Sequence, residues 1–359
     1  NQWANVVRWE MRPRLFLRTA EFLWQEGHTV HASEDEAIQE TLSMLETYRS
    51  FMEDVLAIPV IIGRKSAGER FPGAVDTYTC EAMMQDRKAV QAGTSHYLGQ
   101  NFSKASNIKF TNREGVIEYG YTTSWGVTTR LIGSLIMCHG DDDGIRLPPR
   151  IAPKQIVIIP IIPKPEYEAE VLMYADRIAS RLKDVMLFDQ KLKVFVDKRD
   201  KRGGDKSWEW IKKGVPIRIE VGPKDMEGQG ATIGRRDKPH KEKTNCEIFM
   251  LEKVIVEILE EIQKGYFEEA KKVRAENLRE DITTFEQFKE FFTPKNKDKP
   301  EIHGGFVLAK WSENPDSEKL LEELKVTVRC LPLEQSKTEG TCILTGEKAT
   351  TDAIFAKAY

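Results

Sequence analysis

The chain has 359 residues, of which 40% are hydrophobic and 31% are charged, and its formal net charge is −3 at pH 7. This length predicts two or three domains with real cores, and the mixed charge excludes a globally basic nucleic-acid-binding protein. No stretch approaches 18 uncharged apolar residues and no secretion leader is visible, so we expect no membrane span. Five widely spaced cysteines favour a reducing, cytoplasmic setting over a disulfide scaffold.

Two stretches within about the first thirty residues have patterns that predict secondary structure. Asn5 to Glu10 (NVVRWE) is β-branched and apolar, which predicts a strand. Phe16 to His31 is expected to begin extended and to become helical after Thr19. The short segment between the two runs is therefore predicted to be a basic loop.

Four arginines gather at this loop. Arg12 and Arg14 lie in it, and Arg8 and Arg18 lie near its mouth. Guanidinium groups bind phosphate bidentately and stay charged, so such a fork suits a polyphosphate. A solvated basic hairpin is the alternative, and the spacing by itself leaves both open.

The segment that follows predicts helices separated by a loop and a strand. Ser33 and Glu36 form a capping-box pattern before a helical stretch that Pro59 ends. A polar loop is expected over Gly63 to Thr79, and a helix over Glu81 to Ala89. An apolar helix bearing Arg130 in its first turn follows a predicted strand.

Leu147 to Pro153 (LPPRIAP) predicts a domain boundary, because the paired prolines forbid helix continuation. The module that follows alternates strands and helices, which predicts a mostly parallel sheet. Its expected strands are 155–162, 193–196 and 217–221, and its expected helices are 167–182 and 207–213. A long helix over 247–278, a short one over 284–292 and a charged linker over 294–300 complete the prediction.

Charged residues recur on the last of these strands. Arg218 and Glu220 alternate along it, so they share one face, where they could hydrogen-bond base edges. Arg235 and Arg236 lie close by and could hold phosphates. A solvated charged strand is the competing interpretation.

Several sequence blocks carry a family resemblance. RWE, FLRT and WQEGH resemble motif 2 of class II aminoacyl-tRNA synthetases, in the form used by prolyl-tRNA synthetases. Further blocks follow in the same order as in that family: QAGTSHYLGQNF (91–102), SWGVTTRLIG (124–133), LPPRIAP (147–153), GVPIRIEVGPKD (214–225) and FAKAY (355–359). The similarity runs nearly end to end and is closest to the archaeal and eukaryotic-type branch.

The resemblance implies an α/β multidomain fold. Residues 1–150 would form a class II catalytic domain on an antiparallel sheet, 151–265 an α/β anticodon-binding domain, and 266–359 a small α+β C-terminal domain. Relatives have a segment before motif 2, with a dimer-forming motif 1 and a loop that clamps the proline amine. We expect that the numbering starts inside a longer protein or that the chain is a fragment.

The same resemblance implies a nucleotide site. Arg8 and Arg130 would be catalytic, and Gln91 would face ATP and its Mg²⁺. The full set implied for ATP is Arg8, Glu10, Arg18, Thr19, Gln91, Thr94, Thr128 and Arg130. A helix N-terminus at Arg130 would add a favourable field for phosphate.

A proline pocket is implied beside it, and it needs flat apolar walls because the pyrrolidine ring offers no side-chain hydrogen bond to read. The residues implied are Arg8, Trp24, Glu26, His28, Phe71, His96 and Ser124. From the residues alone, Trp24 could equally be core, Phe71 a loop anchor, and His96 structural.

Zinc-containing relatives bind the metal in their terminal domain through four cysteines. The matching positions here are Ser312, Ser317, Cys342 and Thr345. Hydroxyl groups are too basic to replace thiolates, so we expect no structural zinc.

The resemblance thus implies an ATP-dependent, Mg²⁺-assisted enzyme that joins L-proline to tRNA(Pro), in the cytoplasm and as a homodimer. A non-catalytic RNA-binding relative of the same fold is the alternative, because the segment before motif 2 is not in view. A ligase that charges something other than tRNA is a further alternative, against which the anticodon-like module argues.

Overall fold

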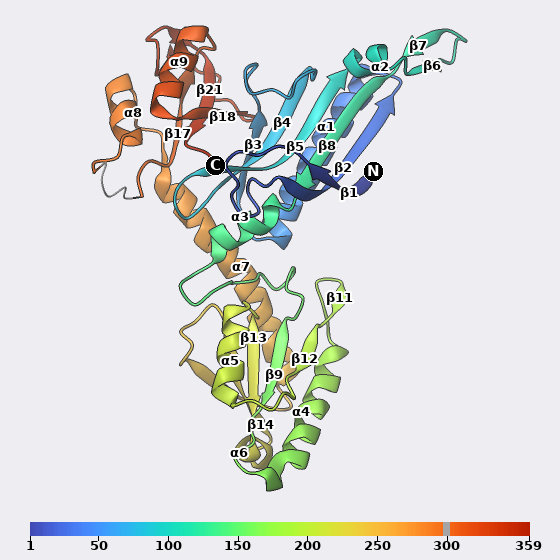
Figure 1. The fold of residues 1–359 in the computed structure, drawn as a ribbon, viewed down its shortest axis with the longest axis vertical. Coiled ribbons are helices and arrows are strands. Elements are labelled where there is room, and N and C mark those ends of the chain that lie inside the picture. The colour runs from blue at the N-terminus through green and yellow to red at the C-terminus, as the bar shows by residue number, and fades with distance from the viewer. Residues whose placement is uncertain (297–301) are drawn as a thin grey trace. The chain divides into compact units, whose positions relative to one another are not determined.

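The computed structural model describes residues 1–296 and 302–359, and it divides into two compact units (Figure 1). Unit 1 contains residues 1–54, 58–138 and 271–359, and unit 2 contains residues 55–57 and 139–270. Most of residues 1–138 thus lie in one unit with residues 271–359, and the predicted division into three domains stays a prediction. The expected linker over 294–300 lies partly outside the described residues.

Unit 1 is built on a ten-stranded sheet with the order β1-β2-β8-β5-β4-β3-β18-β21-β17-β16. Its pairs are antiparallel except β16 with β17. The strands of this sheet are β1 (Gln2–Val7), β2 (Glu21–His31), β3 (Val60–Arg64), β4 (Asp76–Met83), β5 (Ala89–Gly99), β8 (Tyr121–Thr128), β16 (Leu278–Arg279), β17 (Phe306–Trp311), β18 (Thr327–Pro332) and β21 (Thr351–Ala356). The mixed α/β fold with a large antiparallel sheet agrees with the predicted fold class.

The other elements of unit 1 surround this sheet. Two small hairpins are β6 (Lys109–Thr111) with β7 (Ile117–Tyr119), and β19 (Gly340–Thr341) with β20 (Lys348–Ala349). The helices are α1 (Glu34–Ser50) with a π-helical turn (Phe51–Val55), α2 (Asn101–Ala105), α3 (Arg130–His139), α8 (Phe285–Phe292) and α9 (Pro315–Leu324). Ser33 accepts a hydrogen bond from the Glu36 backbone at the start of α1, as the capping pattern predicts.

Two predicted helices are wrong. The segment after Thr19 is the strand β2, not a helix, because it is paired on both sides, with β1 and with β8. Residues 81–89 are the end of β4, a tight turn and the start of β5, with Arg87 at a φ of 65° in the turn. Tertiary pairing outweighs the local preference in both segments, since each strand gains a complete ladder of hydrogen bonds.

Helix α1 covers one face of the sheet, where it packs on β5 and β8. Ser95 donates to the Thr41 carbonyl at 2.7 Å, and Tyr97 donates to Glu34 at 2.8 Å, so the odd-numbered residues of this part of β5 face the helix. Because side chains alternate along a strand, Thr94 and His96 face the opposite side. The functional side chains described below lie on that opposite face.

A buried ion cluster joins β3, β4 and β18. Glu81 is 0% exposed, and it accepts hydrogen bonds from Lys65 at 2.8 Å and from Arg329 at 2.8 Å. Lys65 also donates to the Arg329 carbonyl at 2.7 Å, and Thr79 donates to Glu81 at 2.9 Å. The cluster is satisfied on all sides, which is the condition for keeping charges in an apolar interior.

Unit 2 contains a five-stranded sheet with the order β12-β9-β13-β14-β15. Its first three strands are parallel and the last two antiparallel, so the expected parallel sheet is confirmed for β12, β9 and β13 only. The elements are β9 (Ile156–Pro160), a 3₁₀ turn (Pro165–Tyr167), α4 (Glu168–Lys183), β10 (Met186–Leu187), β11 (Gln190–Lys191), β12 (Val194–Val196), α5 (Gly203–Lys212), β13 (Ile217–Val221), α6 (Pro223–Glu227), β14 (Gly230–Arg235), β15 (Lys243–Glu247) and α7 (Leu251–Asn277), whose last residues belong to unit 1.

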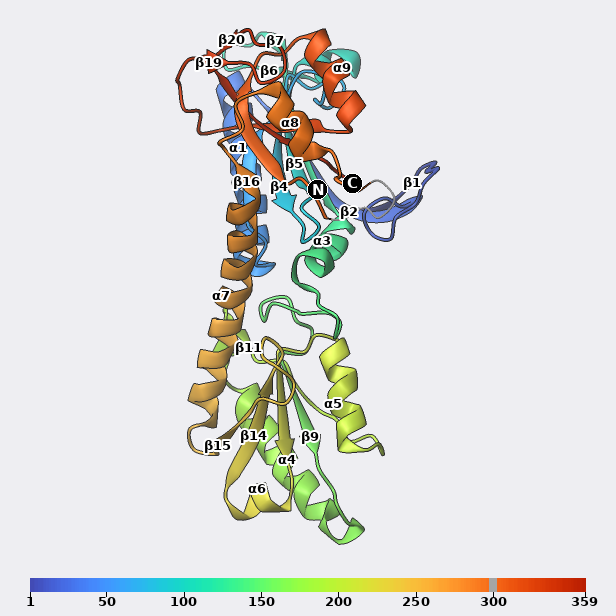
Figure 2. The same cartoon turned by 90° about the vertical axis from the view of Figure 1, so that its left-hand side faces the viewer.

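Apolar side chains of α4 and α7 pack on one face of this sheet. Ile156, Ile158, Ile217 and Ile219 form the sheet side of that core and are 0% exposed. Figure 2 shows the sheet of unit 2 with α4 and α5 beside it. Within the described residues, no helix is both long enough and apolar enough to cross a membrane.

Removing one partner of the buried cluster should be costly. We expect Arg329→Ala to lower the free energy of unfolding by about 3–5 kcal/mol, because Glu81 would lose one of two buried cations. Urea unfolding measures this, and Arg279→Ala, which breaks an exposed pair with Asp281, is the control without a measurable effect. A loss no larger than that of the control would contradict the expectation.

The effect should also depend on pH. Burial favours a higher pKa for Glu81, but Arg329 and then Lys65 outweigh it and hold the pKa below its usual value of 4.5. A depressed carboxyl pKa contributes stability above the unfolded pKa, and this stability is lost as pH falls through the folded pKa. The difference between the wild-type protein and Arg329→Ala should therefore shrink below about pH 4.5.

Candidate active site

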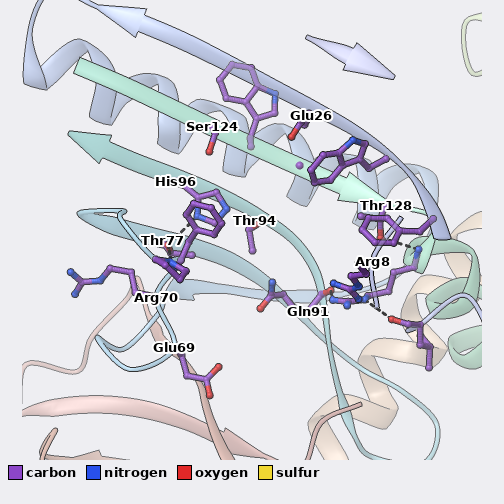
Figure 3. Close-up of a pocket in the computed structure, with 18 of the residues that line it drawn as sticks. Arg8, Glu26, Glu69, Arg70, Thr77, Gln91, Thr94, His96, Ser124 and Thr128 are labelled. Carbon is purple, nitrogen blue, oxygen red and sulfur yellow. Dashed lines mark hydrogen bonds between the residues drawn. The ribbon is translucent and has the colours of Figure 1, made fainter. Parts of the chain in front are cut away.

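A cavity of about 480 Å³ opens on the face of the unit 1 sheet that α1 leaves uncovered. Figure 3 shows the side chains that converge on it from β2, β4, β5, β8 and the loops beside them. The predicted site residues that line it are Arg8, Thr19, Trp24, Glu26, His28, Phe71, Gln91, Thr94, His96, Ser124, Thr128 and Arg130. Glu10 and Arg18 are not among its lining residues.

Strand register explains why these residues meet. His28, Ser124, His96 and Thr77 form one row across four neighbouring strands, because each is paired with the next. Glu26, Gly126 and Thr94 form a parallel row, two residues further along the strands. Residues two apart on a strand share a face, so both rows point into the cavity.

A β-bulge turns Gln91 into the cavity. Cys80 pairs with Gly93 but Glu81 pairs with Gln91, so one residue of β5 has no partner at this point. The extra residue shifts the alternation, and Gln91 comes to line the cavity although Gly93 lies against Met52 and Tyr48 under α1. Simple alternation along the sequence would have placed Gln91 on the other face.

Arg8 and Arg130 line the same end of the cavity. Arg8 follows β1, and its guanidinium carbon lies 4.9 Å from the centroid of the Phe22 ring. Arg130 begins α3, and it donates from Nε to the Leu17 carbonyl at 3.1 Å and from Nη1 to the Gln91 carbonyl at 3.2 Å. Burial, with a further contribution from Arg8, lowers the pKa of Arg130, so this end of the cavity favours an anion.

Glu10 and Arg18 pair with each other in the loop between β1 and β2. Arg18 Nε donates to Glu10 at 2.7 Å, and the Arg12 backbone N–H donates to the same carboxylate at 3.1 Å. The hydrogen bond from Arg18 is the main cause of the lowered pKa of Glu10. Thr19 Oγ1 donates to the Glu21 carbonyl at 2.7 Å, which closes the loop onto β2.

Aromatic and small residues shape the other end. The Phe71 ring lies 4.8 Å from the His96 ring, centroid to centroid, and Thr77 Oγ1 lies 2.9 Å from His96 Nδ1. On the opposite face of the sheet, Trp125 lies over Gly27, where any Cβ would come within 2.4 Å of the indole, so only glycine permits this approach. In the cavity, the Phe71 ring therefore supplies an aromatic wall beside polar groups at defined points.

The cavity also contains residues that the sequence did not predict. They are Phe16, Leu17, Phe22, Glu69, Arg70, Pro72, Thr77, Trp125 and Gly126. Thr77 and Trp125 could have been found from the register with His96 and Gly27 had the strands been paired in advance. No local sequence signal singles out Glu69 or Arg70.

The residues predicted to contact an anticodon lie in unit 2, and most of them are already paired. Glu220 accepts from Lys243 at 2.6 Å, and Arg235 pairs with Asp237 at 2.8 Å and Glu261 at 2.6 Å. Arg236 is buried, where its Nη1 donates to Asp141 at 2.7 Å and its Nε donates to the Ile211 carbonyl at 3.0 Å.

Arg218 differs from the expected exposed position, since it is only 1% exposed. It shares a face of β13 with Glu220, but its guanidinium lies over Gly234 of β14, where a Cβ would come within 3.0 Å of Nη2. Its Nε and Nη1 are buried without a hydrogen-bond partner in the described part of the chain. Burial lowers the pKa of Arg218 to about 10, so the group stays charged at neutral pH.

The positions that match the zinc ligands of relatives hold a hydrogen-bonded set. Ser312 Oγ lies 3.4 Å from Thr345 Oγ1, and Ser317 Oγ donates to the Asn314 carbonyl at 2.8 Å. Cys342 is buried beside them. Among residues 1–296 and 302–359, no group of three or more histidine, cysteine, aspartate or glutamate side chains is placed to hold a metal ion.

The ring of His96 should remain neutral over the working pH range. Burial, with a smaller contribution from His28, lowers its pKa from 6.5 to about 4. The folded state therefore gains stability from this group above pH 6.5 and loses it as pH falls towards 4. An NMR titration of labelled histidines measures the midpoint, with His96→Gln to assign the resonance; a midpoint near 6.5 would contradict the buried, uncharged ring.

Comparison with known proteins identifies the family. Residues 155–261 match the family described as "Anticodon binding domain", and residues 297–359 match "Prolyl-tRNA synthetase, C-terminal". The whole chain is 64% identical to a proline–tRNA ligase of Protochlamydia amoebophila and 52% identical to one of Bdellovibrio bacteriovorus, covering 71% of each relative. A proline–tRNA ligase of Rhodopirellula baltica is 52% identical, with 70% of its length covered. The chain therefore belongs to the proline–tRNA ligase family of aminoacyl-tRNA synthetases, which are ligase enzymes.

Proposed function

We propose that the unit 1 cavity activates L-proline with ATP and transfers the prolyl group to tRNA(Pro). A proline carboxylate oxygen attacks the α-phosphorus of ATP, the bond to the β-phosphate oxygen breaks, and pyrophosphate leaves. The terminal ribose hydroxyl of the tRNA then attacks the prolyl carbonyl and releases AMP. The observation that supports this proposal is the convergence of Arg8 and Arg130 on one end of a cavity whose other end is apolar.

Charge stabilisation, not acid–base chemistry, is the main task in the first step. Arg8 is proposed to hold the α-phosphate as its charge develops, and Arg130 the γ-phosphate side, because fixed guanidinium groups in a partly dry site act strongly on anions. Arg130 is already oriented by two backbone carbonyls, so little motion is needed to receive the phosphate.

The remaining nucleotide contacts are proposed from the loop and strands around these arginines. Glu10 and Arg18, joined by a hydrogen bond, would hold the adenine end and the γ-phosphate side, which requires the loop between β1 and β2 to close over the cavity. Thr19, Thr94 and Thr128 line the cavity and would supply hydroxyl groups.

Mg²⁺ fits the Gln91 side of the cavity, where the side-chain oxygen is the proposed protein ligand. Mg²⁺ prefers oxygen ligands, keeps several waters, and is commonly bound through one or two protein groups plus phosphates. When bound, the ion neutralises part of the phosphate charge. Gln91 has the further task of fixing Arg130 through its backbone carbonyl.

Proline is proposed to bind at the apolar end. Phe71, Trp24 and His96 would form the walls of its ring, and a neutral His96 suits that task because a charged ring would be costly there. Glu26 and His28, whose side chains lie 3.5 Å apart, would bind the proline imino group together with Ser124. Arg8 would bind the carboxylate.

The match of residues 155–261 to an anticodon-binding domain supports a tRNA partner. Glu220 and Arg235 are the contacts that we propose for RNA, since exchange of an ion-pair partner would free either group. Arg218 and Arg236 are buried, so they would act on RNA from below the protein surface. Arg218 would reach the RNA only after the side chains that cover it move.

Three finer points are proposals as well. We infer a homodimer, a cytoplasmic location and the archaeal and eukaryotic-type branch, all supported by the resemblance of the motifs. Sedimentation of the natural protein as a monomer would contradict the first of these. We also propose that unit 1 holds no structural zinc, because serine and threonine occupy three of the four matching positions; elemental analysis giving one zinc per chain would contradict it.

Loss of an arginine at the anionic end should disable the first step. Arg8→Ala is expected to reduce kcat of proline-dependent pyrophosphate exchange by about 100-fold or more, as for other preorganised donors to a developing charge. Arg113→Ala, in the exposed turn between β6 and β7, is the matched control and should exchange normally. A wild-type protein without exchange would instead favour the non-catalytic relative.

Loss of an anticodon contact should affect only the second step. Glu220→Gln is expected to raise the KM for tRNA(Pro) roughly tenfold, since one base-specific contact carries about 1–3 kcal/mol. Pyrophosphate exchange, which needs no tRNA, should stay unchanged. Glu242→Gln, on the exposed loop before β15, is the control, and equal behaviour of the two variants would count against the contact.

A further inference from the structure

The loop between β3 and β4 brings an unassigned cation to the cavity. Residues 65–75 form this loop, and Glu69, Arg70, Phe71 and Pro72 from it line the cavity wall. Phe71 is used by the proposed proline site, but Arg70 has no task there. Its position requires a separate explanation.

The loop is held in place at several points. Lys65 is fixed at its start by the buried ion cluster, and the Ala67 backbone N–H donates to Glu313 at 2.6 Å. The Phe71 backbone N–H donates to Thr77 Oγ1 at 3.1 Å, and the Ala74 backbone N–H donates to the Phe71 carbonyl at 2.9 Å. Arg70 thus extends from a fixed backbone and is not part of a freely moving tail.

Arg70 has no partner for its charge within residues 1–296 and 302–359. Its Nε is shielded from solvent and makes no hydrogen bond there, and no ion pair or side-chain hydrogen bond of Arg70 is found. Arg130, by contrast, is bound by two carbonyls. A half-buried guanidinium with unused donors is well suited to an incoming carboxylate or phosphate, to which it can donate bidentately.

The place of Arg70 in the cavity limits which anion this can be. In Figure 3, Arg70 lies beyond Thr77 and His96, whereas Arg8 and Gln91 lie at the opposite end. On the proposed function, the phosphates of ATP occupy the Arg8 end. The anion at Arg70 must therefore come from another reactant that enters past the proline end.

We infer that Arg70 binds a phosphodiester of the acceptor end of tRNA during prolyl transfer. This inference rests on the proposed function, because it needs the prolyl carbonyl to lie between Arg8 and Arg70. The terminal ribose must reach that carbonyl, so the phosphates before it trail out along the side where Arg70 lies. One guanidinium at this point would fix the strand as the hydroxyl attacks.

The two half-reactions provide the test. Arg70→Ala in the natural full-length protein should leave proline-dependent pyrophosphate exchange within about twofold of the wild type, with an unchanged KM for ATP. It should lower kcat/KM for aminoacylation of tRNA(Pro) about tenfold or more, which is the scale of one charge-assisted hydrogen bond. Arg70→Lys, which keeps the charge, should recover part of the loss.

A matched control removes the same charge at the start of the loop. Arg64 is half-exposed, pairs with Asp76 at 3.4 Å and does not line this cavity, so Arg64→Ala should aminoacylate normally. The logarithmic dependence of tRNA affinity on salt should fall by about 0.7 in Arg70→Ala, as for one lost phosphate contact to a single strand. With tRNA trimmed of its last three nucleotides, wild-type and Arg70→Ala proteins should bind equally.

Three results would overturn the inference. Normal aminoacylation by Arg70→Ala would exclude a contact in the transfer step, and a raised KM for ATP would assign Arg70 to the nucleotide phosphates. An undiminished affinity gap on trimmed tRNA would place the contacted phosphate elsewhere in the RNA. Failure of the proposed function is distinguishable, because the wild-type protein would then show no pyrophosphate exchange at all.

Discussion

The register of four antiparallel strands is the constraint on which the candidate active site depends. Pairing of β2 with β8, β8 with β5 and β5 with β4 aligns His28, Ser124, His96 and Thr77 in one row. A slip of one residue in any pair would turn half of that row towards α1, because successive side chains point to opposite faces. The hydrogen bonds of Ser95 and Tyr97 to α1 fix the register from the other face.

The charged groups of unit 1 are of two kinds: a buried cluster paired with a carboxylate, and cavity arginines for which the described residues show no ion pair. Lys65, Glu81 and Arg329 are buried together and satisfy one another's charged groups through hydrogen bonds, which suits a purely structural task. The cationic end of the cavity is the opposite case, since the lowered pKa of Arg130 reflects burial beside Arg8. An enzyme that binds a polyanion gains from such an excess of positive charge, because the ligand supplies the missing partner.

The two ends of the cavity differ in the chemistry that they favour. Guanidinium groups at one end suit phosphates, and the aromatic wall of Phe71 at the other suits a small apolar ring. The backbone contributes through the bulge that turns Gln91 into the cavity. A two-substrate reaction needs such a division, since both reactants must lie at fixed positions before the bond forms.

Local sequence patterns determined the helix at α1, the position of Arg130 at the start of α3, the parallel core of unit 2 and the motifs that indicate the family, because capping, periodicity and identity are readable along the chain. Only the tertiary structure decided that the segment after Thr19 is a strand, that a β-bulge turns Gln91 into the cavity where the resemblance implied it, that Arg218 is buried and that Arg70 lies at the cavity wall. These four depend on pairing, a bulge and packing between segments far apart in the sequence, and such contacts leave no local pattern to read.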